Sequence, residues 1–580
     1  MKKARKQLVP FVLAAATCLP AGAGADAGTA EDRAALFDYI LEATLERTAF
    51  SPFKITNIGP TGYDSIEELV RAESLELRDE FIAADTDDAL FYALRKLSSV
   101  RWDSHLHVYP IEGGIELSGY RRGYGGKVEE WTEHAPIKFK PDYGEPGAYA
   151  LFVSDFSKDF SSLSGGEAAS IGDVLVGVNG QSAAAYLDRL RRYHGKSSIN
   201  SLWWDLAYSL PLKAWFIDPA LYAGETIRLE LRREDGELYA VDLPYLRYDA
   251  IEWSGYDDRY TDIARAEYVG RREGFAEEDE AWNAWKYPGY ERLFSTPSFD
   301  LYVNEQRQTF LLKWNLFTQN VREHVQRFVD YAAAGDKLHY ATIWDGLRTR
   351  GGNYGVWMLQ RMQPLPFKTT FGNLRISDIT PGLAEELREN ALERIEQQGR
   401  HADVLEAREI LHPDNGQFLV DWLDTDLAAA IENGQAYSSN VPFKNYYLPK
   451  HSDGVVYPAD VHLRGPLILF VGPAGCSQVD QFVSMVVDND LGFSVGMPAG
   501  GCSNTWEWVE DLVFPISGKP VARYMWTAGH TIRPNGEIME GNSSPVDVYI
   551  PLTRHNYLDY YEMLFAAAYR YMDTQPGDDR

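Results

Sequence analysis

The most informative stretch of the sequence is Pro466-Leu467-Ile468-Leu469-Phe470-Val471-Gly472-Pro473-Ala474-Gly475-Cys476-Ser477. The apolar run at its start predicts a buried strand, and the glycines after it predict a tight turn. Apolar residues then recur at helical spacing, at Val479, Phe482, Val483 and Val486. The segment is therefore expected to fold as a strand, a glycine turn and a helix, with Ser477 where the helix begins.

A serine at this junction has two interpretations. Its hydroxyl can cap the helix by accepting a hydrogen bond from one of the first backbone N–H groups, and for this segment alone capping is the favoured interpretation. The serine can also act as a nucleophile. The turn would lift the hydroxyl off the sheet, and the N–H groups of the helix N-terminus would stabilise the charge that develops on an attacked carbonyl.

Two other segments favour the nucleophile. Residues 343–352 read Ile-Trp-Asp-Gly-Leu-Arg-Thr-Arg-Gly-Gly. The N–H groups of Gly351 and Gly352 can approach a ligand closely because no side chain intervenes. Near the C-terminus, residues 534–540 read Pro-Asn-Gly-Glu-Ile-Met-Glu and predict a hairpin turn that presents the carboxylate of Glu540. Taken alone, the first is an ordinary turn and the second a solvated charge.

A helix and a strand frame a histidine in the N-terminal region. Residues 31–100 have helical periodicity, which is clearest after the acidic stretch 85–88. The helix is expected to end at Ser98-Ser99, and alternation over 100–109 predicts a strand. His105 is therefore expected in a turn or at the start of a strand.

Residues 140–245 change to a pattern of short strands. Residues 171–180 read Ile-Gly-Asp-Val-Leu-Val-Gly-Val-Asn-Gly, which predicts a turn, a strand and a second turn and resembles the corresponding stretch of PDZ domains. The carboxylate-binding loop of PDZ domains is not evident, and residues 182–222 indicate a longer helical excursion than a plain PDZ domain has. Peptide binding by this module is therefore not implied.

From residue 300 onward, apolar strand candidates alternate with helix candidates, which predicts an α/β layer structure. The candidate strands are Thr309 to Leu316, Tyr340 to Trp344, Pro466 to Val471, Phe493 to Val495 and Val546 to Ile550. A charged helical stretch interrupts this series and is interpreted as an inserted cap over the core. The expected fold class is thus α/β multidomain, with an N-terminal helical region over 26–139, a PDZ-like β module over 140–248, and an α/β core over 249–580 that carries the helical insertion at 377–450.

In this order the segments resemble the peptidase family that includes the carboxyl-terminal processing proteases, tricorn protease and the chlamydial protease-like activity factor. The resemblance covers most of the mature chain and implies a ClpP/crotonase-like peptidase core. That core has a strand leading to Gly-Gly, a strand leading to the nucleophilic serine, and a later Gly-x-Pro-x-x-Gly-like turn. Here the turn reads Gly496-Met497-Pro498-Ala499-Gly500-Gly501-Cys502, and it aligns without a gap from Ser477.

The site residues implied by the resemblance follow from where the chain departs from each branch. Processing proteases have a lysine base at the position of Cys502, so a Ser-Lys dyad cannot operate. Tricorn and the chlamydial factor use a histidine from a segment that Ser104-His105 resembles and a glutamate from a segment that residues 536–540 resemble. The implied catalytic triad is Ser477, His105 and Glu540.

The resemblance also implies an oxyanion hole, formed by the amides of Gln478 and of Gly351 or Gly352. Arg350 stands where the family commonly has asparagine. In such a triad the imidazole accepts the serine proton, and the carboxylate fixes the imidazole tautomer and stabilises its cation. The implied function is a serine endopeptidase that cleaves protein or peptide substrates through an acyl-enzyme, with no cofactor.

The N-terminus is typical of an exported protein. Its basic residues are Lys2, Lys3, Arg5 and Lys6. They precede an apolar run, Leu8 to Leu19, that is too short to cross a bilayer, and small residues follow up to Ala25. We therefore predict a signal peptide over residues 1–25, a periplasmic or secreted mature protein, and no membrane insertion.

Charge and cysteine content limit the partners and the redox state. The formal net charge of −29 becomes −33 once the four basic residues of the leader are removed, which disfavours nucleic acid as a partner. A homo-oligomer remains open. Cys476 and Cys502 are the cysteines outside the leader, and a single disulfide between them is an open alternative to two thiols.

Several other interpretations remain open. The Asp103-Ser104-His105-Leu106-His107 segment also resembles the His-x-His of metal-dependent amidohydrolases, although the helical preamble argues against a metal site and favours a structural His107. His530 or His555 could replace His105 as the base. Cys476 offers a thiol nucleophile.

An interpretation from another class is a non-catalytic protein that keeps the peptidase fold to bind peptides or other ligands. Fold alone does not establish activity. Cys502 and Arg350 are departures that a degenerate scaffold would also show, whereas the retained serine, histidine and glutamate favour an enzyme.

Overall fold

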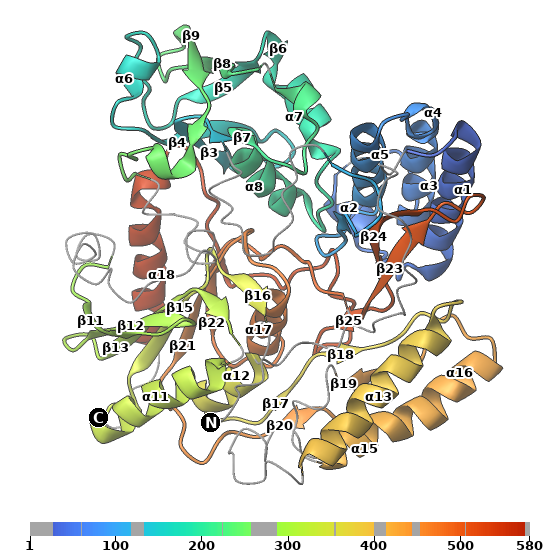
Figure 1. The fold of residues 1–580 in the computed structure, drawn as a ribbon. Helices are drawn as coiled ribbons and strands as arrows, with labels where there is room; N and C mark the ends of the chain where they lie inside the picture. Colours follow the sequence, from blue (N-terminus) through green and yellow to red (C-terminus); the bar gives the residue numbers. More distant parts are fainter. Residues whose placement is uncertain are drawn as a thin grey trace, which may run out of the picture.

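The computed structural model of the chain describes residues 27–59, 61–117, 133–222, 224–256, 287–318, 320–352, 355–398, 413–442, 453–504 and 506–574. The predicted signal peptide, residues 1–25, lies outside the described residues. The described part is a mixed α/β multidomain structure, as the sequence predicts (Figure 1).

A seven-stranded sheet forms the centre of the C-terminal half. Its strands, in spatial order, are β11 (Glu291–Ser295), β12 (Phe299–Asn304), β13 (Thr309–Trp314), β15 (Ala341–Asp345), β21 (Leu467–Val471), β22 (Phe493–Gly496) and β26 (Val548–Tyr549). The first three pair antiparallel, and from β13 to β26 all neighbours run parallel. The candidate strands from residue 300 onward all have counterparts in this sheet.

Helices cover both faces of this sheet, which is why its strands are apolar throughout. In β21, Leu467, Leu469 and Val471 pack on one face, whereas Ile468 and Phe470 pack on the other, as the two-residue period of a strand requires. The first face is covered by α11 (Val321–Ala334), α12 (Gly355–Met362) and α17 (Gln478–Val487), and the second by α18 (Tyr560–Thr574).

The N-terminal region is helical, as predicted. It consists of α1 (Ala30–Arg47), α2 (Lys54–Asn57), α3 (Ile66–Glu76), α4 (Arg78–Ala83) and α5 (Asp87–Ser99). Thr86 caps α5 by accepting a hydrogen bond from the Ala89 N–H. After α5 the chain makes a turn that contains His105 and enters β1 (Val108–Tyr109), so the expected position of His105 is confirmed.

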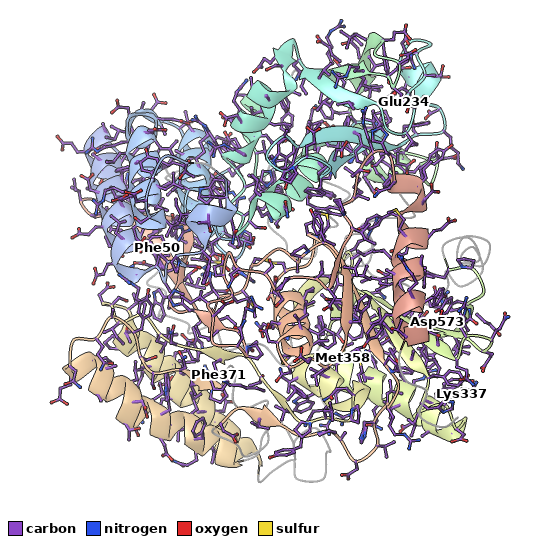
Figure 2. All side chains as sticks on the ribbon, turned by 180° about the vertical axis from the view of Figure 1, so that it is seen from behind. Phe50, Glu234, Lys337, Met358, Phe371 and Asp573 are labelled. Carbon is purple, nitrogen blue, oxygen red and sulfur yellow. A yellow bond between two sulfur atoms is a disulfide. The ribbon has the colours of Figure 1, made fainter. Side chains whose placement is uncertain are left out.

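Strand β1 attaches the N-terminal region to the core. It pairs antiparallel with β24 (Pro520–Thr527), which forms a hairpin with β23 (Glu507–Val513). Figure 1 shows this hairpin beside the N-terminal helices, away from the seven-stranded sheet. Figure 2 places Phe50 at the side of the N-terminal region that faces the core, and the Ala49 N–H donates to the Thr527 carbonyl oxygen.

The middle module is a six-stranded antiparallel sheet with helices, among them the short α6 (Phe160–Leu163) between β4 and β5. Its strands are β3 (Ile137–Asp142), β4 (Ala150–Phe156), β5 (Val174–Val178), β6 (Gln181–Ser182), β8 (Thr226–Arg232) and β9 (Leu238–Pro244). The expected turn, strand and second turn are present around β5, with Gly172, Asn179 and Gly180 at positive φ. The expected helical excursion consists of α7 (Ala183–Arg191) and α8 (Ile199–Ser209).

The charged insertion forms a helical hairpin. Its helices are α13 (Thr380–Gln398), α15 (Pro413–Trp422) and α16 (Ala428–Glu432), with a π-helical turn over Leu423–Leu427. Figure 1 shows these helices below the N-terminal region, next to β18 (Phe371–Gly372), β19 (Val441–Pro442) and β25 (Thr531–Ile532), which form a small sheet. Among the described helices, none is both long and apolar enough to cross a bilayer.

A buried arginine holds the turn that leads to His105. Arg101 is fully buried and donates to the Met525 carbonyl oxygen at 2.6 Å and to the Ser98 Oγ at 2.6 Å. Its guanidinium lies 4.4 Å from the centroid of the Tyr524 ring. One side chain therefore joins the end of α5 to strand β24.

Replacing Arg101 by lysine is expected to lower the free energy of unfolding by about 2–3 kcal/mol, because an ammonium group cannot make the same set of planar contacts in a buried position. Urea denaturation of the purified variant checks this. Arg232→Lys, at an exposed position of β8, is the matched control and should leave the midpoint unchanged. Equal midpoints for both variants would contradict the assigned role of Arg101.

Candidate active site

Ser477 lies at a strained junction between β21 and α17. Its backbone has φ 62° and ψ −117°, a region that residues other than glycine rarely adopt. Its hydroxyl makes no capping hydrogen bond, so the capping interpretation does not describe this helix. The Ser477 N–H instead donates to the Cys502 carbonyl oxygen at 2.7 Å, which fixes the junction against the next loop.

The expected glycine pair lies against the serine. Gly351 belongs to β16 (Arg350–Gly352), which runs parallel to β14 (Leu316–Phe317). A Cβ atom at Gly351 would be 2.4 Å from the Ser477 Cβ and 2.8 Å from its Oγ. Gly352 has φ +132°, and a Cβ there would meet the Phe317 carbonyl oxygen. Neither position has room for a side chain, so the backbone itself approaches Ser477.

Gln478 is the first residue of α17. Its N–H has no partner within the helix, because the first N–H groups of any helix lack one. The structure therefore gathers Ser477, Gln478 and Gly351 at the carboxyl ends of the neighbouring strands β21 and β15, where ligands of open parallel sheets bind.

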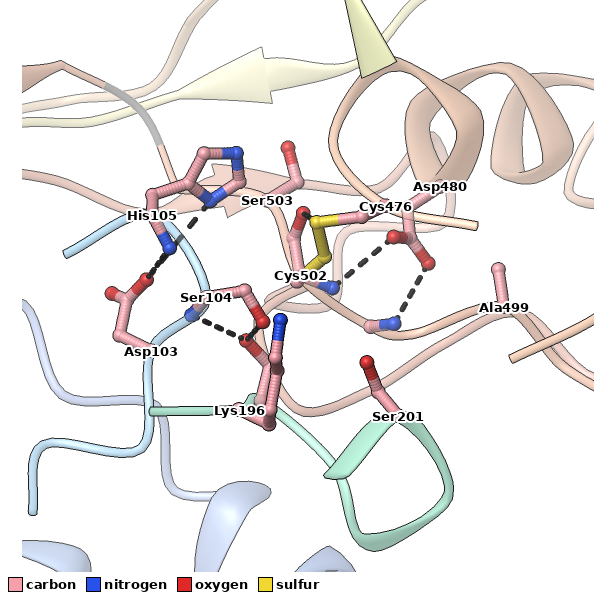
Figure 3. The surroundings of a disulfide bond; sticks show 12 residues. Asp103, Ser104, His105, Lys196, Ser201, Cys476, Asp480, Ala499, Cys502 and Ser503 are labelled. Atoms are coloured by element: carbon pink, nitrogen blue, oxygen red, sulfur yellow. Dashed lines mark hydrogen bonds and ion pairs between the residues drawn. A yellow bond between two sulfur atoms is a disulfide. The ribbon is translucent and has the colours of Figure 1, made fainter. Parts of the chain in front are cut away.

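The loop after β22 folds back toward Ser477, and a disulfide joins it to the residue before the serine. Cys476 and Cys502 are bonded, and the Gly500 N–H donates to the Gly475 carbonyl oxygen at 2.7 Å. Figure 3 shows this bridge with Asp103, Ser104 and His105 among the residues around it. Because the Cys476 sulfur is already bonded, the thiol-nucleophile alternative does not apply to this oxidised form.

His105 comes from the N-terminal region and lies beside Asp103. The His105 N–H donates to the Asp103 Oδ1 at 2.9 Å, and its Nδ1 is 4.0 Å from the same oxygen. This buried Nδ1 has no hydrogen-bond partner in the described part of the chain. The ring is partly accessible, with 21% of the side chain exposed.

Asp103 is a buried carboxylate that the sequence analysis did not assign to the triad. Its Oδ2 accepts hydrogen bonds from the Asn504 Nδ2 at 2.5 Å and from the Thr527 Oγ1 at 2.7 Å. Burial raises the pKa of Asp103, but Lys54, His105 and the Thr527 hydroxyl together outweigh it and hold the pKa below its usual range. Its place two residues before His105 was the sequence signal that could have identified it.

Glu540 is fully buried in the same neighbourhood. Its Oε1 is 2.9 Å from the Lys54 Nζ, and its Oε2 accepts a hydrogen bond from the Ser503 N–H at 2.8 Å. Burial raises the pKa of Glu540, and with a contribution from Asp103 it outweighs the opposing effect of Lys54, so the pKa lies above its usual range. The interpretation of Glu540 as a solvated surface charge is therefore wrong, because a turn of the core buries it.

The three expected triad residues thus reach one neighbourhood without a complete hydrogen-bonded relay. The Ser477 N–H donates a hydrogen bond to the Cys502 carbonyl oxygen, and the N–H of Ser503, which follows Cys502, donates to the Glu540 carboxylate. Among the hydrogen bonds of the described residues, none joins the His105 ring to Ser477 or Glu540, and the ring Nδ1 lies 4.0 Å from Asp103. The His105 imidazole is thus hydrogen-bonded to neither of its expected partners in this structure.

The other histidines occupy different surroundings. His107 packs beside Tyr109, and burial lowers its pKa to about 3, with a further contribution from Arg95. His530 is buried, its Nε2 lies 3.1 Å from the Phe50 carbonyl oxygen, and burial lowers its pKa to about 4. His555 is exposed. No group of three or more potential metal-ligating side chains occurs within the described ranges.

Replacing both Cys476 and Cys502 by serine is expected to lower the free energy of unfolding by roughly 3 kcal/mol, because a bridge between residues 26 positions apart restricts the unfolded chain. Urea denaturation with and without a thiol reductant measures this. The reductant should shift the wild-type midpoint and leave the double variant unchanged. A wild-type midpoint that does not respond to the reductant would rule out a contribution of the bridge.

Asp480, on the first turn of α17, gives a pH-dependent expectation. Burial raises its pKa to about 7 from 3.8, although the N–H groups of Gly501 and Cys502 donate to it. Between these two pH values the folded state holds a proton that the unfolded chain has released, so stability falls as the pH rises. Thermal melts at a series of pH values measure this. The melting temperature of Asp480→Asn should fall less with rising pH than that of wild type, whereas the control Asp188→Asn, at an exposed position, should follow wild type. The same pH dependence in all three proteins would contradict the raised pKa of Asp480.

No protein-family model and no curated protein matches the sequence. Solved structures, however, match most of the chain. Mature CPAF complexed with lactacystin is 13% identical, and the match covers 94% of this chain and 99% of that chain with a TM-score of 0.62. Mature CPAF has the same identity and coverage and a TM-score of 0.61.

Weaker matches include the photosystem II D1 C-terminal processing protease, with 12% identity, 89% and 92% coverage and a TM-score of 0.38. At these identities the likeness concerns the fold alone. This chain has the fold of CPAF over most of its length, and the expected resemblance to the family of carboxyl-terminal processing and tricorn-type peptidases is thereby confirmed at the level of structure.

Proposed function

We propose that this protein is an exported serine endopeptidase that hydrolyses peptide bonds through an acyl-enzyme on Ser477. The observation that carries the proposal is the strained backbone of Ser477, whose hydroxyl caps nothing and lies against the bare backbone of Gly351. Strained residues persist where the surroundings hold them, and they cluster at active sites. The CPAF-like fold supports a peptidase over other hydrolases.

In the proposed reaction, the Ser477 Oγ attacks the peptide carbonyl while His105 removes its proton. The N–H groups of Gln478 and of Gly351 or Gly352 receive the negative charge of the tetrahedral intermediate. His105 then gives the proton to the departing amine, and water, activated by the same imidazole, hydrolyses the ester. Glu540 stabilises the imidazolium that forms in each half of the reaction.

The surroundings of the site support a restricted and extracytoplasmic peptidase. The PDZ-like module and the helical insertion would limit which chains reach Ser477. A disulfide beside the nucleophile is typical of periplasmic or secreted proteins, where such bridges persist. Because His105 comes from the N-terminal region, the proposed activity requires that region to dock on the core.

Labelling with a fluorophosphonate probe tests the proposal. Wild type should form an adduct at Ser477, located by mass spectrometry, and should cleave an unstructured protein substrate. Ser477→Ala should abolish the adduct, and His105→Ala should reduce its rate at least about a hundredfold, because general-base catalysis contributes about that much.

Two controls sharpen this test. Ser484→Ala, on the same helix, and His555→Ala, at an exposed histidine, should label at the wild-type rate. A fall with His555→Ala would assign the base to the C-terminal histidine instead. A folded wild type that neither labels nor cleaves would favour the alternative function, a non-catalytic protein that binds peptides or other ligands.

A further inference from the structure

We propose that Lys54 is a positioning residue of this site, and that its ammonium group holds the Glu540 carboxylate in place beside Asp103 and favours its charged form. The inference rests on the proposed function and deepens it. It makes the activity of Ser477 depend on a short helix at the far end of the sequence.

Lys54 is a fully buried lysine whose charge is used within the site. It is 1% exposed, and lysine is almost never buried to this extent unless it is paired. Its Nζ lies 2.9 Å from the Glu540 Oε1, 4.0 Å from the Asp103 Oδ2 and 3.5 Å from the Arg101 carbonyl oxygen. The ammonium group therefore stands between two buried carboxylates.

The two carboxylates could not both be ionised without a nearby cation. They repel each other, and burial disfavours the charged form of each. Glu540 also raises the pKa of Asp480 on α17, and His105 lowers the pKa of both Asp480 and Asp103. Lys54 lowers the pKa of both Glu540 and Asp103. Lys54 thus favours the charged form of both carboxylates, which suits the imidazolium formed during catalysis.

Backbone contacts fix α2 to the turn that follows Glu540. A Cβ atom at Gly541 would lie 2.8 Å from the Lys54 Cγ and 3.1 Å from its Cα, so only glycine fits there. The Asn57 side-chain amide donates to the Gly541 carbonyl oxygen, and the Gly541 N–H donates to the Gly501 carbonyl oxygen at 2.7 Å. The residue after Glu540 is thus clamped between α2 and the loop that carries the disulfide.

The position of Glu540 therefore depends on the docking of the N-terminal region. Asn57 and Gly541 are 484 positions apart in the sequence, and the same contacts that bring them together bring Lys54 to Glu540. Loss of α2 from this place would leave Glu540 without its cation, and the carboxyl group would take up a proton. A protonated Glu540 cannot stabilise the imidazolium.

The test measures the rate of fluorophosphonate labelling at Ser477 against pH for wild type and Lys54→Met. Without the ammonium group the pKa of Glu540 rises, so the acid limb of the profile should move to higher pH by about one unit or more. At a pH on the acid limb the rate should fall about tenfold, since one pKa unit is a factor of ten. Lys96→Met is the matched control, because Lys96 pairs with Glu80 away from the site, and its profile should be unchanged.

A double-mutant cycle keeps the test valid if Lys54→Met unfolds. Glu540→Gln combined with Lys54→Met removes both ionisable groups and should fold better than Lys54→Met alone, because no buried carboxyl group must take up a proton or stay charged without a cation. In the Glu540→Gln background, Lys54→Met should change the labelling rate less than about twofold. An equal loss in both backgrounds would show that Lys54 acts through general stability and would overturn the inference.

Infrared titration of the Glu540 carboxyl group distinguishes this inference from the proposed function. The carboxyl band, assigned by its loss in Glu540→Gln, should titrate at higher pH in Lys54→Met than in wild type. This infrared measurement does not require Ser477 to be reactive. An inert Ser477 with a shifted band would refute the peptidase and keep the role of Lys54 in ionising Glu540. A reactive Ser477 with an unshifted band would refute the role of Lys54 alone.

Discussion

The hydrogen bond from the Ser477 N–H to the Cys502 carbonyl oxygen is the contact on which the rest of the site depends. A serine with positive φ at a strand-to-helix junction is unfavourable unless its surroundings hold it. Three contacts supply that constraint. They are the hydrogen bond to Cys502, the Cys476–Cys502 disulfide, and the hydrogen bonds that Asp480 accepts from the next loop. The same loop continues into Ser503, which binds Glu540, so the nucleophile and the buried carboxylate are set by one short segment.

The buried charges beneath this loop form a second layer. Asp103, Glu540 and Lys54 come from three segments that are distant in sequence, and each is almost completely buried. A buried charge is tolerated where it is paired and hydrogen-bonded, and here every one of the three has such partners. The arrangement links the N-terminal helices to the core more specifically than apolar packing alone would do, because removing one partner leaves the others uncompensated.

Docking of the N-terminal region also depends on strand pairing and on Arg101. Strand β1 extends the β23–β24 hairpin, and Arg101 bridges the end of α5 to β24. These contacts determine where the turn with His105 lies. Within the described part of the chain, the His105 N–H donates to Asp103, the ring Nδ1 lies 4.0 Å from the same carboxylate, and no hydrogen bond joins the ring to Ser477.

The sequence by itself determined the strands and helices of the core and the start of the site. Apolar runs bounded by glycine predicted β15, β21 and β22, and helical spacing predicted α17, because these patterns reflect local geometry. The tertiary structure alone decided that Glu540 is buried, that Lys54 pairs with it, and that Cys476 bonds to Cys502. Lys54 lies in a short helix with no distinguishing pattern. Its role arises from its contact with Glu540, near the other end of the sequence, and no local periodicity records contacts of that range.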